Sequence, residues 1–589
     1  MQIYYRTFHL ICRLWSHFNS KKRFQFLGFL ALTFLASFAE MISIGAILPF
    51  LAILTTPENL LKFKIVKSIT LFFGIYNPSQ LLLYVTIFFI IAVLFAASIR
   101  LILLWLSSWL SFSLGAELSR EMYRITLYQP YIVHCKRNSS EVINGITNKA
   151  DLIIYSIVLP TLSLITSFFL LCGVLLALIL IDPIITLLGF GCFGLVYAVL
   201  IFLVKVQVKN NGNVIAAESS KVIKSLQEGL GGIRDVLIDN SQKTFVDIYC
   251  DADKALRRAQ GINLFIGNSP KYILEAMGMT FIAILAFTLT KKNSSDVLPI
   301  IGALALGAQR LLPVLQQIYS SWVNIQASLS PLKDVLDILE QPNFDFNSSL
   351  NDNKILFKKS IELKNVSFRY DQKLPYVFRN INLKINKGQF IGFVGTTGVG
   401  KSTLIDILIS LLQPTSGSLE IDGKKITKFN QCQWQRKIAH VPQSIFLTDG
   451  SIEENIAFGV PANQIDPLRV RESAKLACIS SSIEQLPLKY KTFVGERGIR
   501  LSGGQKQRIG IARALYKGAQ VLIFDEATSS LDYKTESEVM KSISKLNQKI
   551  TLLVIAHRVS TLKNCDLIVD LRQNGLKVGK FSQIVKINK

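Results

Sequence analysis

The residues most capable of chemistry form one short stretch in the second half of the chain. Glycines, hydroxyl side chains and a lysine follow the apolar run 390–394 and precede a helical pattern at 404–408. Glycines let the backbone wrap around an anion, and amide groups at a helix N-terminus supply positive potential. The stretch therefore predicts a phosphate-binding loop for a nucleoside triphosphate, made by Gly395, Thr396, Thr397, Gly398, Val399, Gly400, Lys401, Ser402 and Thr403.

Four side chains in and near this loop have predicted tasks. Lys401 would reach the β and γ phosphates, and the Ser402 hydroxyl would bind Mg²⁺. The apolar run 521–524 ends in Asp525 and Glu526, which otherwise could cap a strand. We expect Asp525 to hold Mg²⁺ through water and Glu526 to polarise the attacking water. ATP and Mg²⁺ are therefore the expected cofactors.

Two further features complete the predicted hydrolytic site. His557 follows the predicted strand 551–556 and would bond the γ-phosphate and the water, although a histidine at a strand end is often structural. A second anion site is predicted at the start of a helix that begins near residue 503. Its residues are Ser502, Gly503, Gly504 and Gln505. One chain cannot easily fold this site onto its own phosphate loop, whereas two chains placed head to tail can each lend it to the other.

The composition indicates a membrane protein with a second, water-exposed domain. Hydrophobic residues make up 50% of the 589 residues and lie mostly before residue 325, and the mean hydropathy is +0.38. The net charge of +25 could suggest nucleic acid, but the basic residues form no aromatic-interleaved patch. Anionic lipid is the more fitting partner, and no nucleic acid is expected. Eight scattered cysteines without a CxxC pair argue against disulfides and zinc.

Six apolar runs predict membrane spans, since about 20 residues cross a bilayer as a helix. Positive charge places the connections 111–150 and 205–260 in the cytoplasm with both termini. Residues 1–22 are expected to form an interfacial amphipathic helix, and 55–80 to lie on the outer leaflet. The predicted spans are residues 24–54, 81–110, 152–181, 184–204, 270–290 and 297–322.

Helical periodicity continues beyond the second and fourth spans. It runs through 111–128 and 205–228, so these helices would project tens of ångströms into the cytoplasm, to turning points near 128–140 and 229–234. The predicted fold is a membrane all-α six-helix domain fused to an α/β P-loop ATPase domain. The expected boundaries are 1–330 for the transmembrane domain, 331–354 for a linker and 355–589 for the nucleotide-binding domain.

The motifs occur in the order found in ATP-binding cassette (ABC) transporters, and the whole chain resembles half-size exporters of the type IV fold. That resemblance implies ATP hydrolysis coupled to transport by a homodimer in the plasma membrane, bacterial inner membrane being the expected one. It assigns adenine stacking to Tyr370, nucleotide and Mg²⁺ contacts to Gln443, and a nucleotide contact to Asp532. The family more often has alanine at Ser530. The cytoplasmic turning points would be coupling helices that dock on the ATPase domains.

The substrate is indicated by charged residues within apolar runs, which usually face a cavity or a partner. Arg310 and Arg100 are the candidate substrate residues, and an anionic head would suit two copies of Arg310. The alternatives are that Arg310 pairs with Glu40 or Glu275, or that its side chain extends to the membrane surface. A weaker resemblance to exporters of lipid-linked oligosaccharides and polysaccharides makes such an amphipathic precursor the expected substrate. Lys271 is a further charge in these runs.

Other functions remain open at this point. Lipid and multidrug exporters fit the same motifs, whereas peptidase-bearing peptide exporters are expected to carry an additional N-terminal domain. An ATP-gated channel or regulator would keep the ATPase domain without coupling hydrolysis to work. A soluble ATPase acting on DNA or ribosomes does not fit six spans, and importers usually carry their ATPase domains on separate chains.

Overall fold

The computed structural model describes residues 2–55, 78–181, 183–290, 297–341, 355–527, 532–544, 550–555, 562–572 and 575–584. The chain divides into two compact units, each considered by itself. The helical unit comprises residues 1–127 and 137–343, and the nucleotide unit comprises 128–136 and 344–589. The expected outer-leaflet segment falls mostly at 56–77 and the connection 342–354 follows α15; both lie outside the described residues.

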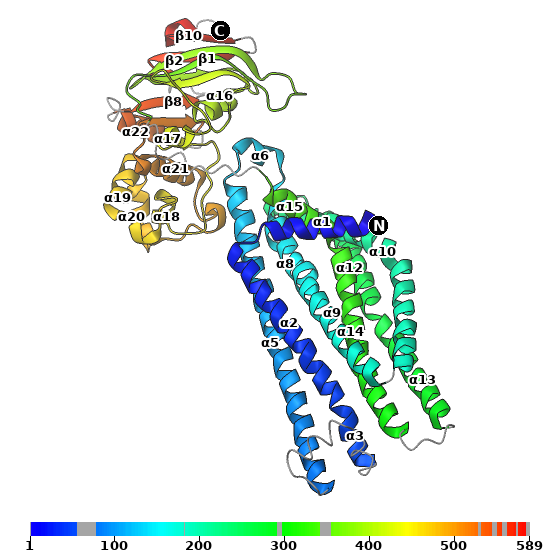
Figure 1. Cartoon of the computed structure of the whole chain (residues 1–589). Helices are drawn as coiled ribbons and strands as arrows, with labels where there is room; N and C mark the ends of the chain where they lie inside the picture. Colours follow the sequence, from blue (N-terminus) through cyan, green and yellow to red (C-terminus); the bar gives the residue numbers. More distant parts are fainter. Residues whose placement is uncertain are drawn as a thin grey trace. The chain divides into compact units, whose positions relative to one another are not determined.

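Helices account for the whole described part of the helical unit (Figure 1). The predicted spans are helical, although the first is divided between two helices, Ser20–Gly45 and Ile47–Thr55. The chain is helical throughout 139–181, with two π-helical turns. Four stretches, 20–51, 82–127, 139–180 and 183–231, are long and apolar enough to cross a membrane. The elements are α1 (Gln2–Ser16), α2 (Ser20–Gly45), α3 (Ile47–Thr55), α5 (Pro78–Leu127), α7 (Ser139–Asn144), η2 (Gly145–Lys149), α8 (Ala150–Ile153), η3 (Ile154–Val158), α9 (Leu159–Ile181), α10 (Pro183–Gly231), α11 (Ile233–Ile238), α12 (Gln242–Asn268), α13 (Pro270–Thr290), α14 (Val297–Ala327) and α15 (Leu329–Leu339).

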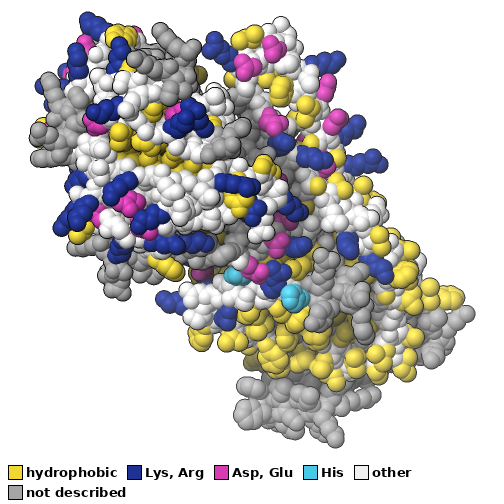
Figure 2. Space-filling view, turned by 90° about the horizontal axis from the view of Figure 1, so that it is seen from above, with side chains coloured by type: hydrophobic (Ala, Val, Ile, Leu, Met, Phe, Trp, Pro, Cys, Tyr) yellow, Lys and Arg dark blue, Asp and Glu magenta, His cyan; other side chains and the backbone are white. Residues whose placement is uncertain are grey.

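The surface of these helices is apolar over wide areas, as Figure 2 shows for one face of the molecule. Large side chains such as Leu94, Leu187 and Phe202 are more than half exposed. Contiguous apolar surface of this kind is costly in water and favourable in lipid. The exposed residues therefore support a membrane environment for α5 and α10.

The predicted long extensions are confirmed. Helix α5 runs over 50 residues to Leu127, and α10 runs over 49 residues to Gly231. Each is followed by a short helix at the predicted turning point: α6 (Tyr131–Lys136) in one case and α11 in the other. Unbroken apolar and polar periodicity without an internal glycine–proline stop explains why both helices continue past the apolar run.

The amphipathic helix predicted at the N-terminus is present as α1, and it packs on α15. Leu10 and Leu14 of α1 are buried in the same core as Leu336 of α15. Arg13 donates two hydrogen bonds, of 2.9 and 2.6 Å, to the carboxylate of Glu340. These bonds from Arg13 lower the pKa of Glu340. Helix α15, which falls within the predicted linker, thus packs into the helical unit.

The nucleotide unit is built on a six-stranded sheet of order β10-β9-β3-β8-β7-β6. Strand β10 pairs antiparallel with β9, and the other neighbours pair in parallel. Parallel strands joined through helices bring their carboxyl ends to one edge, where ligands usually bind. The strands are β3 (Phe390–Val394), β6 (Ile438–Val441), β7 (Val521–Asp525), β8 (Thr551–Ile555), β9 (Leu567–Arg572) and β10 (Gly575–Gly579).

A second, antiparallel sheet of order β2-β1-β4-β5 accompanies it, which the sequence analysis did not separate from the α/β pattern. Its strands are β1 (Ser360–Phe368), β2 (Phe378–Asn386), β4 (Ser416–Ile421) and β5 (Lys424–Lys425). The helices of the unit, besides α6, are α16 (Lys401–Leu408), α17 (Gln431–Gln435), α18 (Ile452–Ile456), α19 (Pro467–Leu476), α20 (Ser480–Glu484), α21 (Gly503–Lys517), α22 (Tyr533–Ser544) and α24 (Phe581–Ile584).

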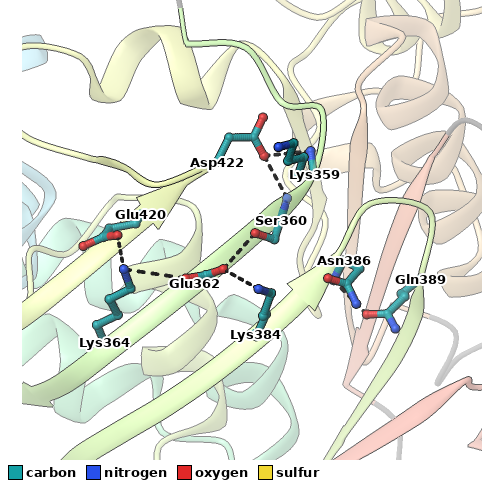
Figure 3. A network of polar contacts seen from close by, with 9 residues as sticks. All are labelled: Lys359, Ser360, Glu362, Lys364, Lys384, Asn386, Gln389, Glu420 and Asp422. Carbon is teal, nitrogen blue, oxygen red and sulfur yellow. Dashed lines mark hydrogen bonds and ion pairs between the residues drawn. The ribbon is translucent and has the colours of Figure 1, made fainter.

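One side of the antiparallel sheet carries a polar network (Figure 3). Lys364 lies 2.6 Å from Glu420, and Lys384 lies 3.0 Å from Glu362. Exposed cross-strand pairs of this kind contribute little to stability, because water and salt screen them. They favour the strand register but do not by themselves hold the sheet together.

Asp422 belongs to the same network and holds three backbone amides. Its carboxylate accepts hydrogen bonds from the backbone amides of Lys358, Lys359 and Ser360 at 2.6, 2.7 and 2.8 Å. Partial burial alone would raise the pKa of Asp422, but the three amides together hold it below its ordinary value. Asp422 therefore fixes the backbone where the chain enters the nucleotide unit.

We expect Asp422→Asn to loosen this entry point. An amide oxygen accepts weaker hydrogen bonds than a carboxylate, so the amide protons at 358–360 should exchange about tenfold faster. Because the native pKa is lowered, this protection is present above the ordinary carboxyl pKa and is lost as the pH falls through the native value. Hydrogen exchange of the full chain, read by mass spectrometry, measures both effects. Glu420→Gln is the control, and equal exchange in the two variants would contradict the assignment.

Candidate functional site

The phosphate loop connects β3, which ends at Val394, to α16, which begins at Lys401, as predicted. Gly395, Gly398 and Gly400 have φ values of +149°, +84° and +101°. Side chains rarely adopt such values, so these positions need glycine. A Cβ on Gly395 would lie 2.6 Å from the carbonyl oxygen of Leu571. The loop therefore has a backbone that depends on glycine and that lets amide groups approach a phosphate.

Lys401 lies within this loop and not in solvent. It is 9% exposed, and its Nζ donates hydrogen bonds to the carbonyl oxygens of Gly395 and Thr396 at 2.8 and 3.1 Å. The ammonium group is thus held at the loop that would surround the phosphates. This placement fits its predicted contact with the β and γ phosphates.

Two acidic side chains lie beneath the loop. Asp525 ends β7, and burial raises its pKa, partly offset by a hydrogen bond from Ser402. Asp406 of α16 is half-buried, and this burial together with Asp525 raises its pKa to about 6. A hydroxyl beside a carboxylate is the oxygen set that Mg²⁺ prefers. Ser402 and Asp525 therefore fit the predicted Mg²⁺ site.

Glu526, predicted to polarise the attacking water, and Gln443, predicted to contact nucleotide and Mg²⁺, are in contact. Nε2 of Gln443 donates a hydrogen bond of 2.9 Å to the carboxylate of Glu526. Glu526 has φ of +51°, an uncommon value for a residue with a side chain. It follows β7 directly, so its carboxylate lies beyond the strand end beside Asp525. Strain at such a position is typical of functional sites.

Tyr370 lies close to the phosphate loop. Its hydroxyl is 3.0 Å from the Oγ1 of Thr403, and its ring packs edge-on against Phe368 at 5.0 Å. Helix α6 contacts the same region: Lys136 forms an ion pair of 2.8 Å with Asp371, and Ile132 packs on the core below. Tyr370 is therefore near the phosphate loop, while adenine stacking stays a prediction.

The second anion site is built as a helix start. Ser502 caps α21: its hydroxyl accepts from the amide of Gln505, whose side chain in turn accepts from the amide of Ser502. Gly503 and Gly504 form the first turn. The four residues thus form the predicted helix N-terminus, where backbone amides and the helix dipole attract anions.

Two predicted residues have different outcomes. Asp532 accepts a hydrogen bond of 3.0 Å from the amide of Thr535 at the start of α22, and hydrogen bonds from Thr535 lower its pKa. In the described part of the chain it therefore acts as a helix cap, and its nucleotide contact stays a prediction. His557 lies outside the described residues, as does Ser530.

Sequence reasoning did not assign a role to Arg513, which links α21 to the segment after Gln443. Its guanidinium donates to the carbonyl oxygens of Asn455 and Phe446 at 2.8 and 2.9 Å. Burial lowers the pKa of Arg513 to about 10. Only its position on the buried side of α21, two turns after Gln505, could have indicated this positioning role.

The predicted substrate residues lie in the helical unit. Arg310 of α14 forms an ion pair with Glu40 of α2, so the structure supports the alternative pairing. Arg100 of α5 lies 3.5 Å from the same carboxylate. Glu275 is not the partner of Arg310, because it lies 3.9 Å from Lys271 on its own helix. A contact of Arg310 or Arg100 with substrate stays a prediction.

Comparison with protein families gives two matches. The model for the ABC transporter transmembrane region matches residues 26–305, and the model for the ABC transporter itself matches residues 378–529. A solved structure of a bacterial Atm1-family ABC exporter with ATP bound has a TM-score of 0.77, covers 97% of both chains and is 21% identical. At that identity the likeness supports the fold, and it confirms the predicted fold class.

Curated relatives include two leukotoxin translocation ATP-binding proteins named LktB. The protein from Pasteurella haemolytica-like sp. (strain 5943B) is 38% identical over 286 residues, which is 48% of this chain and 39% of that protein. The protein from Mannheimia glucosida is 38% identical over 284 residues, with the same shares. The matched part thus spans well under half the length of these relatives. Both family models confirm the predicted family: the chain belongs to the ABC transporters. It is a multi-pass membrane protein with a transmembrane region and an ATP-binding domain in one polypeptide.

Proposed function

We propose that this chain is half of an ATP-driven exporter that moves an amphipathic substrate from the cytoplasmic side of the membrane to the outer side. The contact of Gln443 with Glu526 and the glycine-dependent phosphate loop support the ATPase part of this proposal. The apolar surface of the long helices supports the transport part. The substrate class rests on the charged residues that these helices carry.

The chemistry of hydrolysis follows from the placement of the side chains. Loop amides and Lys401 bind the phosphates and neutralise the charge that develops on them. When bound to Ser402 and Asp525, with Gln443, Mg²⁺ supplies further positive charge at the phosphate oxygens. Glu526 accepts the proton of the attacking water, and Gln443 orients the Glu526 carboxylate through its hydrogen bond. The arrangement therefore suits attack of water on the γ-phosphate.

A second copy of the chain completes the site in this proposal. The helix start at Ser502 offers backbone amides to an anion but lies on α21, which is separate from the phosphate loop. Two chains placed head to tail would bring this start to the other chain's γ-phosphate. Binding of ATP would then hold the two nucleotide units together, and hydrolysis would release them. The membrane helices would alternate between inward-open and outward-facing arrangements.

We infer that the substrate carries an anionic group on an apolar anchor, with a lipid-linked oligosaccharide or polysaccharide precursor as the preferred class. The observation that carries this inference is the excess of arginine over acid where Arg100, Arg310 and Glu40 meet. A cation at bilayer depth is costly and is usually retained for function. Arg310 and Arg100 are accordingly the proposed substrate residues.

A polypeptide substrate is the second candidate. It is favoured by the names of the curated relatives, which are described as leukotoxin translocation proteins. Their matched part is 39% of their length, so this likeness leaves much of those proteins uncompared. Lipids, drugs and an ATP-gated channel are further alternatives that the same experiment separates.

Reconstitution of the full chain in liposomes tests the proposal. A fluorescent lipid-linked saccharide should move from the ATP-exposed leaflet to the opposite leaflet only when ATP is added, which a membrane-impermeant quencher detects. The Glu526→Gln protein is the matched control and should leave the lipid in place. Movement of a polypeptide or a drug without movement of any saccharide lipid would contradict the substrate class. Ion conduction at constant ATP would instead favour the channel.

A further inference from the structure

Three charged side chains from three helices meet in the helical unit: Glu40 of α2, Arg100 of α5 and Arg310 of α14. We call them the charge cluster. Glu40 is 3% exposed; one of its carboxylate oxygens is bonded to Arg310, and the other lies 3.5 Å from Nε of Arg100. Two guanidinium groups thus share one carboxylate. The formal charge of the cluster is +1.

The depth of the charge cluster in the membrane follows from contacts between α2 and α5 nearer their cytoplasmic ends. Lys22 of α2 is hydrogen-bonded to Ser113 of α5 and lies 5.0 Å from the ring centre of Trp109, a pairing typical of a membrane interface. Glu40 lies eighteen residues from Lys22, and Arg100 lies thirteen residues from Ser113. At 1.5 Å per residue these separations are about 20–27 Å, within a hydrocarbon layer about 30 Å thick. The cluster therefore lies at bilayer depth.

The charge of the cluster is not balanced by the described residues around it. The Arg100 side chain is 41% exposed, and within the described part of the chain it has the ion pair with Glu40 and no hydrogen bond. The Glu40 oxygen that faces it is buried and has no hydrogen-bond partner. Lys271 and Glu275, by contrast, balance each other on α13. An open guanidinium at this depth requires water or an anion to be stable.

We propose that the charge cluster is a binding site for the phosphate or pyrophosphate group of an apolar-anchored substrate. Arg100 contacts the phosphate oxygens, because its guanidinium is the planar fork that matches them and its side chain is partly exposed. Arg310 is held by Glu40 and adds positive potential. This inference rests on the proposed function and deepens it by assigning different tasks to the two arginines.

Glu40 limits the affinity of such a site. Its carboxylate competes with the ligand for Arg100 and places a negative charge next to the bound phosphate. Replacing Glu40 by glutamine would raise the charge of the cluster from +1 to +2 and remove that competitor. The phosphate would then bind more tightly, even though an ion pair is lost. A purely structural ion pair predicts the reverse, because removal of any member leaves a charge unpaired and weakens the protein.

Equilibrium binding to the full chain in phosphatidylcholine nanodiscs tests the proposal, with farnesyl pyrophosphate as probe and uncharged farnesol as its control. Arg100→Gln should weaken the binding of farnesyl pyrophosphate at least tenfold and leave the binding of farnesol unchanged. Glu40→Gln should bind farnesyl pyrophosphate about tenfold more tightly. The double variant Glu40→Gln/Arg310→Gln leaves no buried unpaired arginine and keeps Arg100, so it should retain binding within a few-fold of the native chain. Lys271→Gln is the matched control and should leave the binding of both ligands unchanged.

The outcomes separate this inference from the proposed function. Unchanged farnesyl pyrophosphate binding in Arg100→Gln, or equal weakening of both ligands, overturns the anion site even if a saccharide lipid is transported. Arg100-dependent binding of inorganic pyrophosphate by a chain that transports only polypeptides supports the site and overturns the saccharide-lipid function. Displacement of farnesyl pyrophosphate by phosphatidylglycerol at a ratio of one lipid per probe overturns the assignment to substrate, because it identifies a bilayer phosphate as the ligand.

Discussion

Glu526→Gln is expected to lower the ATPase rate of the full chain by about 10²–10⁴-fold, the usual contribution of a general base. The side chain follows β7 at the edge of the sheet where Asp525 and the phosphate loop meet. Its carboxylate is held by the hydrogen bond from Gln443. A glutamine of the same size cannot accept the proton of the attacking water. The chemical step should therefore fail while the loop that binds phosphate keeps its shape.

Binding should change little in the same variant, and this contrast makes the measurement decisive. Phosphate release gives the rate, and fluorescent ATP gives the dissociation constant, which should stay within about threefold because Lys401 and the loop amides are untouched. Glu538→Gln, at an exposed position of α22, is the control and should hydrolyse ATP at the native rate. Full ATPase activity in Glu526→Gln would show that another group removes the proton.

Local patterns were sufficient to predict most of the nucleotide unit and the course of the long helices. Apolar runs identified β3 and β7, and the glycines, lysine and hydroxyl side chains after β3 identified the phosphate loop between β3 and α16. The helical period persisted through α5 and α10 beyond the apolar residues. The signals for β3, β7, the phosphate loop and the two helix extensions each lie within some twenty residues, where spacing alone carries the information.

Contacts between distant residues were not predictable in this way. The ion pair of Arg310 with Glu40 joins residues 270 positions apart, and sequence reasoning left several partners open for Arg310. Arg13 and Glu340 are separated by 327 positions, so the packing of α15 against α1 had no local signal. The antiparallel sheet was also missed, because strands β1, β2 and β4 alternate with loops and helices along the chain. Pairing of strands and of charges depends on tertiary packing, which a single sequence does not specify.

Gly395→Ala is expected to abolish ATP binding at micromolar concentration. Two costs add at this position: a Cβ would lie 2.6 Å from the Leu571 carbonyl oxygen, which belongs to the backbone of β9, and the φ of +149° is unfavourable for alanine. Overpacking against an immobile group costs about 1–3 kcal/mol, and a strained φ adds about 1–3 kcal/mol. Together they correspond to a loss of affinity of about 10²–10⁴-fold if the loop is displaced to relieve them.

Gly398→Ala separates the two costs. The φ of Gly398 is +84°, but nothing lies within 4 Å of the position of its Cβ, so only backbone strain is added. This variant should lose about tenfold in affinity, and Gly423→Ala, with φ of +79° and equally open space in the turn after β4, should lose none. Titration with fluorescent ATP measures all three, and thermal unfolding checks that each chain is folded. Equal affinities for Gly395→Ala and Gly398→Ala would mean that the close approach of Gly395 to β9 does not determine the shape of the phosphate loop.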